Sequence, residues 1–369
     1  MFRPLEDRLA ALTHRRHCVV TGRGASAIWL TLEAFKDARP DRTRVVLPVT
    51  LCTSPAAVTH HAGLVPVFCD TDPASGNLCP AALERLLETR RDVLCVLAAH
   101  LYGEPADMVR IAEICTRFDV FLIEDAAQSL GAGGVGQHGD VTILSFGHTK
   151  IIDAGGGGAA LTCDAGLDAR LRETEFRLGP KPREAARWAA DYRTTYYGAQ
   201  TEWDGNPAAK RRVGEICKLH PGLYLHRLDE AQAGLILTAL DALPAEVDRR
   251  RERAKAYDEA FRGIGRPLQR SPDGVPWRYG LMLPPAHRDA AVEALRAAGI
   301  DASCWYPRLA PFFGDEGDFP GGEAIEAGVV NLWVDDRADD ARIAHSAALV
   351  RDVLTGAGTN GIKSQDSGT

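Results

Sequence analysis

Residues 139–164 read GDVTILSFGHTKIIDAGGGGAALTCD, and the predicted fold and chemistry of the chain both centre on this segment. The apolar run at residues 141–146 predicts a strand that delivers Ser145, and a tight turn then presents Lys150 before the glycines at 155–158. A lysine at a sheet edge, partly removed from water, becomes a nucleophile that forms imines. Ser145 and His148 are close enough in sequence to bind a phosphate or shape the pocket, although His148 fits a structural histidine bonded to backbone equally well.

The chain before this segment alternates apolar strands with amphipathic helices. Strands are predicted at residues 44–48, 64–70, 92–98 and 120–124, and helices at 25–35, 80–87 and 106–117. Continuous apolar strands joined by crossover helices predict an α/β fold with a mainly parallel sheet covered on both faces. In such sheets ligands bind at the carboxyl ends of the strands. Polar residues that follow these strands are therefore the candidates for chemistry.

One such candidate pair follows the strand in FLIEDAAQSLGA, residues 121–132, where Asp125 and Gln128 come directly after a buried apolar run. Pyridoxal 5′-phosphate (PLP) needs a carboxylate against its pyridine nitrogen, because the protonated ring is the electron sink of its reactions. Asp125 together with Lys150 therefore indicates a PLP site. Taken alone, Asp125 is better explained as the cap of the turn or helix that follows.

Two glycine-containing junctions precede that strand. In TGRGASAIWL, residues 21–30, a glycine turn opens a helix at Gly24, Ala25 and Ser26, and free N–H groups with the helix dipole form an anion site there. Such turns are common, so this segment alone does not identify a phosphate site. In HLYGEPADM, residues 100–108, the end of a strand leads to Tyr102 and then to a helix. An ordinary junction between a strand and a helix explains this segment equally well.

A dinucleotide fingerprint is formally present at Gly131, Gly133 and Gly136. It begins seven residues after the strand that ends at Glu124, and a further strand follows it instead of a helix. A Rossmann motif requires a glycine turn placed directly between a strand and a helix. We therefore reject a nicotinamide dehydrogenase.

The composition and the secondary-structure pattern of the sequence change after about residue 177. Residues 180–220 are rich in Arg, Trp and Tyr, and a long helical pattern runs from 226 to about 261. A smaller α+β unit follows, with a strand at 279–283 and helices at 286–298 and 338–354. We predict an N-terminal helix at 1–15, a large domain at 16–245, a small C-terminal domain at 246–355 and a disordered tail at 356–369.

Composition narrows the possible partners. A net charge of -7 argues against nucleic acid and anionic membranes as the main partner, and no run approaches the roughly 20 apolar residues that span a bilayer. The nine cysteines are scattered and contain no C-x-x-C pair, which favours reduced thiols over disulfides or a metal site. We expect a cytoplasmic protein without a metal.

The motifs GRGASA, HLYGEPADM, IEDAAQSLGA, GDVTILSFGHTK and AGGGGAAL, in this order, resemble the DegT/StrS-type sugar aminotransferases, which are fold-type I PLP enzymes. The resemblance covers residues 17–355 and implies a three-layer α/β/α large domain. It implies that Lys150 holds PLP as a Schiff base and moves the proton, and that Asp125 pairs with the ring nitrogen. Gln128 would lie near the 3-hydroxyl. The phosphate would be held at the junction that contains Gly24, Ala25, Ser26 and Ser145, with His148 nearby.

Two later segments resemble the family less closely. HRLDEAQAGL, residues 226–235, places Arg227 where the family reaches the neighbouring subunit, which implies a homodimer with shared active sites. GIDASCWYPRL, residues 299–309, supplies Tyr306 and Arg308. Arg227 and Arg308 are candidates for a substrate carboxylate or phosphate, although surface ion pairing explains each of them as well. Tyr102 is a further substrate candidate.

Three departures from the family concern the substrate and the partner subunit. Leu51 occupies the place of the aromatic residue that stacks on the PLP ring, Leu225 the place of an asparagine, and Ala310 the place of a histidine. The resemblance implies transfer of an amino group from glutamate or glutamine to a keto-sugar, ketocyclitol or related ketone. The alternatives are another PLP reaction on an amino acid (elimination, replacement or carbon–carbon bond formation) and a non-catalytic PLP-binding regulator.

Overall fold

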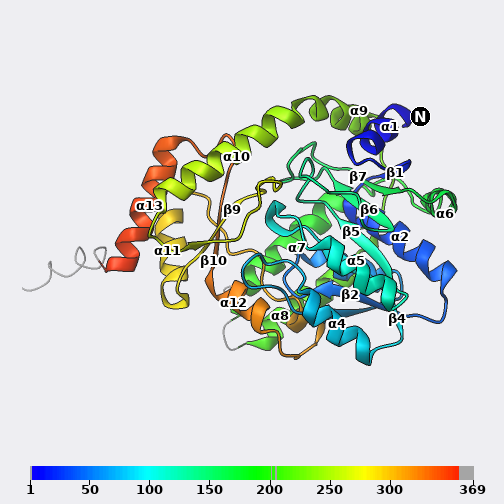
Figure 1. The fold of residues 1–369 in the computed structure, drawn as a ribbon, viewed down its shortest axis with the longest axis horizontal. Coiled ribbons are helices and arrows are strands. Elements are labelled where there is room, and N and C mark those ends of the chain that lie inside the picture. Colours follow the sequence, from blue (N-terminus) through cyan, green and yellow to red (C-terminus); the bar gives the residue numbers. More distant parts are fainter. Residues whose placement is uncertain (1, 201, 204–205, 357–369) are drawn as a thin grey trace, which may run out of the picture.

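A seven-stranded sheet forms the centre of the larger part of the molecule in the computed structural model, which describes residues 2–200, 202–203 and 206–356 (Figure 1). The strand order is β1-β7-β6-β5-β4-β2-β3. All pairings are parallel except those of β7, which runs antiparallel to β1 and β6. The strands are β1 (His17–Thr21), β2 (Arg44–Pro48), β3 (Val65–Cys69), β4 (Val93–Ala99), β5 (Phe121–Asp125), β6 (Val141–Ser145) and β7 (Gly158–Thr162).

Helices cover both faces of this sheet. Along β2, Val45 and Leu47 pack with residues of α2 and α3, whereas Val46 packs with residues of α4 and α5. Successive strand side chains point to opposite faces, so an apolar run such as RVVLP buries both of them. The helices are α1 (Arg3–Leu12), α2 (Gly24–Ala38), α3 (Thr53–His61), α4 (Pro80–Thr89), α5 (Met108–Arg117) and α6 (Ala165–Glu175). The predicted three-layer α/β/α arrangement is confirmed.

The described part of residues 180–220, a segment of the predicted large domain for which the sequence showed no clear strand, is largely helical. It forms α7 (Ala185–Gln200) and α8 (Pro207–Leu219), and α8 packs against α3. Helix α9 (Glu230–Ala239) and helix α10 (Leu243–Ala260) follow. The predicted domain boundary at residues 245 and 246 falls inside α10, so the division of the chain remains a proposal.

The smaller part of the molecule has its own sheet and its own core (Figure 1, yellow to red). The strand order is β10-β9-β8, and all pairings are antiparallel. Its elements are β8 (Arg266–Pro267), β9 (Tyr279–Met282), α11 (Pro285–Ala297), α12 (Pro320–Gly328), β10 (Val329–Leu332) and α13 (Asp340–Thr355). The predicted tail, apart from Gly356, lies outside the described residues.

Two further expectations concern the whole chain. All nine cysteines have free thiols. Within the described part of the chain, no helix is long and apolar enough to cross a membrane.

Candidate active site

The carboxyl ends of β5 and β6 bring the two central candidates together. Asp125 is the last residue of β5 and pairs in register with Ile143 of the neighbouring parallel strand β6. Lys150 follows β6 in a turn in which its N–H donates to the Gly147 carbonyl at 3.2 Å. Parallel strands end at the same edge of a sheet, so the residues that follow them meet there.

Asp125 is buried, with 6% of its surface exposed, and its Oδ1 accepts a hydrogen bond from the Ala127 N–H at 3.0 Å. Burial raises the pKa of its carboxyl group, and the Ala127 hydrogen bond and the positive charges of Lys150 and His100 oppose that rise. A nearby cation therefore favours the ionised carboxylate that a pyridinium nitrogen requires. The hydrogen bond from the Ala127 N–H shows that Asp125 also caps the turn after β5.

The Cys52 thiol lies in the same environment, just before helix α3. Burial raises its pKa, the Lys150 charge lowers it, and the Asp125 charge raises it. The charges of Lys150 and Asp125 thus both act on the Cys52 thiol, which lies at the junction between β2 and α3. The neighbouring Leu51, which replaces the expected stacking aromatic residue, is 2% exposed.

An anion cradle lies beside this pair. A Cβ added to Gly24 would lie 2.9 Å from the Ser145 Cβ, so the start of α2 and the end of β6 are in contact. The first N–H groups of α2, from Gly24, Ala25 and Ser26, have no acceptor within the helix and carry the positive end of its dipole. The Ser26 hydroxyl, in contrast, is fully buried and donates to the Tyr224 carbonyl at 2.6 Å. Only the backbone of Ser26 is therefore available to an anion.

Gln128 connects two aromatic residues that the sequence placed far apart. Its Oε1 accepts from the Tyr102 N–H at 3.0 Å, and its Nε2 donates to the Tyr306 hydroxyl at 3.0 Å. The Tyr102 hydroxyl donates to the Trp305 carbonyl at 2.7 Å and accepts from the Tyr306 N–H at 3.1 Å. Tyr102, Gln128 and Tyr306 therefore form one network that joins the large sheet to the segment after α11.

Two of the candidate side chains, those of His148 and Arg308, contact acidic groups outside the site. His148 is 83% exposed at its side chain, with its Nδ1 3.5 Å from Asp153. Arg308 donates from Nε to Glu326 at 2.6 Å. The structure thus supports the ion-pair explanation of Arg308 and does not bring His148 to Asp125.

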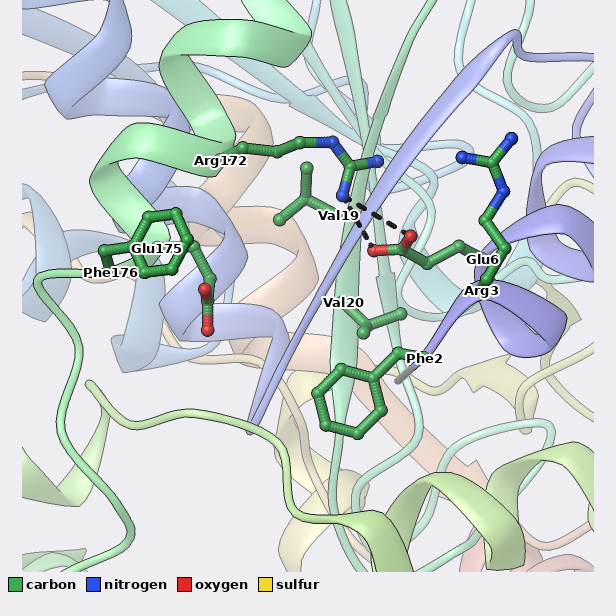
Figure 2. Close-up of a pocket in the computed structure, with 8 residues that line it drawn as sticks. All are labelled: Phe2, Arg3, Glu6, Val19, Val20, Arg172, Glu175 and Phe176. Atoms are coloured by element: carbon green, nitrogen blue, oxygen red, sulfur yellow. Dashed lines mark hydrogen bonds and ion pairs between the residues drawn. The ribbon is translucent and has the colours of Figure 1, made fainter.

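Arg227 lies on another surface. Its Nε is 3.2 Å from the Glu175 carboxylate, and its guanidinium lies over the Phe176 ring. Glu175 and Phe176 line a pocket that also contains Phe2 and an ion pair between Glu6 and Arg172 (Figure 2). This pocket lies between α1, β1 and α6 and contains none of the residues predicted to bind the cofactor.

Sequence reasoning missed Trp277. This residue is 1% exposed, and its indole Nε1 donates to the carbonyl of Thr149, the residue before Lys150, at 2.5 Å. Its ring is stacked near those of Trp305 and Tyr306. No local pattern marks it, because the hydrogen bond joins residues 128 positions apart.

These groups fit PLP. A buried carboxylate, a lysine at the adjacent strand end, a hydroxyl and a helix N-terminus match the ring nitrogen, aldehyde and phosphate of that cofactor. In the described residues no group of three or more His, Cys, Asp and Glu side chains could hold a metal ion.

A model of the DegT/DnrJ/EryC1/StrS aminotransferase family matches residues 2–351. The chain belongs to this family. DegT-family aminotransferases are PLP-dependent, so the protein is a PLP-dependent aminotransferase. The match spans both the larger and the smaller part of the fold.

Individual relatives and structures agree with this membership. The chain is 31% identical over 314 residues to a UDP-N-acetyl-3-dehydro-alpha-D-glucosamine 3-aminotransferase of Acidithiobacillus ferrooxidans, covering 83% of this chain and 74% of that protein. It is 31% identical over 263 residues to an L-glutamine:2-deoxy-scyllo-inosose aminotransferase of Micromonospora echinospora, covering 70% and 56%. The structure of NtdA from Bacillus subtilis with bound cofactor PMP superposes with a TM-score of 0.74 at 19% identity, covering 95% and 77%.

Proposed function

We propose that the protein transfers an amino group from glutamate or glutamine to a keto-sugar or ketocyclitol. The observation that carries this proposal is the placement of Lys150 and the buried Asp125 at the ends of two adjacent parallel strands. Relatives named for a 3-dehydro sugar and for L-glutamine with a cyclitol ketone support the class of acceptor and donor.

PLP, when bound, supplies the electron sink that lets a proton leave the carbon bearing the amino group. Lys150 then holds and returns that proton, since its flexible side chain leaves the turn after β6 beside Asp125. Asp125 keeps the ring nitrogen protonated, and Gln128, fixed by Tyr102 and Tyr306, orients the ring. Ser145 and the N–H groups that open α2 hold the phosphate.

The acceptor side of the site lies toward the α7–α8 segment in this proposal. The Tyr192 hydroxyl of α7 and the Thr53 Oγ1 at the start of α3 are 2.7 Å apart, one residue from Cys52. Tyr196 is buried in the same helix. In this proposal the hydroxyl groups of Tyr192 and Thr53 exchange their mutual hydrogen bond for bonds to a polyhydroxylated substrate.

We further propose a cytoplasmic homodimer with shared active sites. Nine free thiols support a reducing compartment. Phe176 is 75% exposed beside the pocket of Figure 2, and the Arg227 guanidinium lies over its ring, so we place the interface on this surface. Arg227 belongs to residues 226–235, the segment that resembles the part of the family that reaches the partner subunit.

A visible absorption spectrum before and after addition of L-glutamate or L-glutamine tests the function. We expect a yellow band that bleaches with one of these donors and that is absent from Lys150→Ala, whereas Lys181→Ala, an exposed lysine of residues 180–220, keeps it. A band that ignores both donors but responds to another amino acid would move the assignment to elimination, replacement or carbon–carbon bond formation. A band without any turnover would favour a PLP-binding regulator, and no band after reconstitution with PLP would refute the cofactor site.

A further inference from the structure

Thr149, the residue before Lys150, has a backbone conformation that its side chain disfavours. Its φ is 74°, in the left-handed region, and a β-branched residue is a steric outlier there. Such a conformation persists only where the surroundings hold it in place. The direction in which Lys150 leaves the turn depends on it, because Thr149 and Lys150 share a peptide group.

Both backbone polar groups of Thr149 are hydrogen-bonded. Its N–H donates to the Asp153 carboxylate at 3.1 Å, within the same loop. Its carbonyl, which belongs to the peptide group shared with Lys150, accepts from the Trp277 indole N–H at 2.5 Å. The second bond comes from outside the loop, from the chain just before β9 of the small sheet.

Trp277 is itself a rigid donor. Its backbone N–H donates to the Tyr102 carbonyl at 2.9 Å, and its ring stacks near Trp305 and Tyr306 with centroid separations of 6.1 and 6.0 Å. The guanidinium of Arg278 lies 4.8 Å from its ring centroid. A buried aromatic ring held on several sides keeps its single N–H in one direction.

We propose that Trp277 is a positioning residue for Lys150, holding the peptide group before the lysine and so coupling the small sheet to the reactive amine. The inference rests on the proposed function of Lys150. A hydrogen bond of this kind changes an equilibrium by about tenfold, and small displacements of a reacting group reduce a rate by similar or larger factors.

Trp277→Phe removes the N–H and keeps an aromatic ring. Trp333→Phe is the matched control, because the Trp333 indole also donates a hydrogen bond within the small domain, to Asp301 at 2.7 Å, and is 6% exposed. In the PLP-loaded enzyme we expect Trp277→Phe to lower kcat about tenfold with KM for the amino donor within about twofold. We also expect it to shift the pH titration of the visible band, while Trp333→Phe changes neither.

Thr149→Gly separates positioning from packing. Glycine adopts a φ of 74° without steric cost, so Thr149→Gly added to Trp277→Phe should recover at least about threefold of the lost kcat and move the titration back. If the double variant is no better than Trp277→Phe, or if Trp333→Phe behaves like Trp277→Phe, the positioning role is wrong. If thermal denaturation shows that Trp277→Phe does not fold, Trp277→Met, which also lacks a side-chain N–H donor, replaces it in the same comparison. Absence of the visible band in the unaltered enzyme would instead refute the proposed function.

Discussion

Asp125 and its neighbour Glu124 divide two tasks between adjacent residues of one strand. Successive side chains of β5 point to opposite faces, so Asp125 faces Lys150 while Glu124, fully buried, faces the imidazole of His100 at 3.1 Å. One carboxylate is therefore placed for the proposed cofactor, and the other binds groups within the fold. A shift of the strand by one position would exchange the faces to which these two side chains point.

Asp125→Asn tests the chemical task. Without the carboxylate the ring nitrogen loses its charge partner, and we expect kcat to fall at least about 100-fold while the fold is retained. Asp70→Asn is the control, because Asp70 also follows a parallel strand, β3, but binds the N–H groups of Gly321 and Gly322 at 3.0 and 2.9 Å. The assay is turnover together with PLP affinity measured by absorbance. Equal effects of the two variants would contradict the assignment of Asp125.

At the scale of elements, the loop at residues 131–139 is organised by one side chain. Glu124 accepts hydrogen bonds from the N–H groups of Gly136 at 2.7 Å and Gly139 at 3.0 Å, in addition to its contact with His100. The glycines that imitate a dinucleotide fingerprint are thus part of a connection between β5 and β6 that wraps around a buried carboxylate. The structure confirms that no helix follows them.

This network predicts acid sensitivity. Burial alone raises the pKa of Glu124, but the hydrogen bonds from His100, Gly139 and Gly136 lower it from 4.5 to about 2. A carboxyl whose folded pKa is depressed stabilises the protein above its unfolded pKa and loses that contribution as the pH falls through the folded value. Up to about 3 kcal/mol is therefore lost between about pH 4.5 and pH 2.

Urea unfolding at several pH values tests the predicted loss of stability in acid. Glu124→Gln should be less stable than the unaltered protein at pH 7, and the difference between their midpoints should shrink as the pH falls below 4.5. A difference that is independent of pH would mean that Glu124 acts by shape alone.

At the scale of the whole molecule, the exposed Phe176 and the pocket beside it form the surface on which we propose that a second copy binds (Figure 2). We expect Phe176→Asp to shift the mass measured by light scattering toward the monomer and to lower activity, because the proposed active sites are shared. Val109→Asp is the control, since Val109 is 57% exposed on α5, away from this pocket. A dimer that survives Phe176→Asp would place the interface elsewhere.

The sequence by itself predicted a mainly parallel sheet and that Asp125 and Lys150 each follow one of its apolar strands. The reason is local: strand period, burial and crossover direction place the carboxyl ends of neighbouring strands at one edge. Only the tertiary structure decided which side chains are free there. The Ser26 hydroxyl and the guanidinium groups of Arg227 and Arg308 bind groups distant in sequence, and Trp277 reaches Thr149 across 128 positions. Such partners depend on how whole elements pack, which no local pattern records.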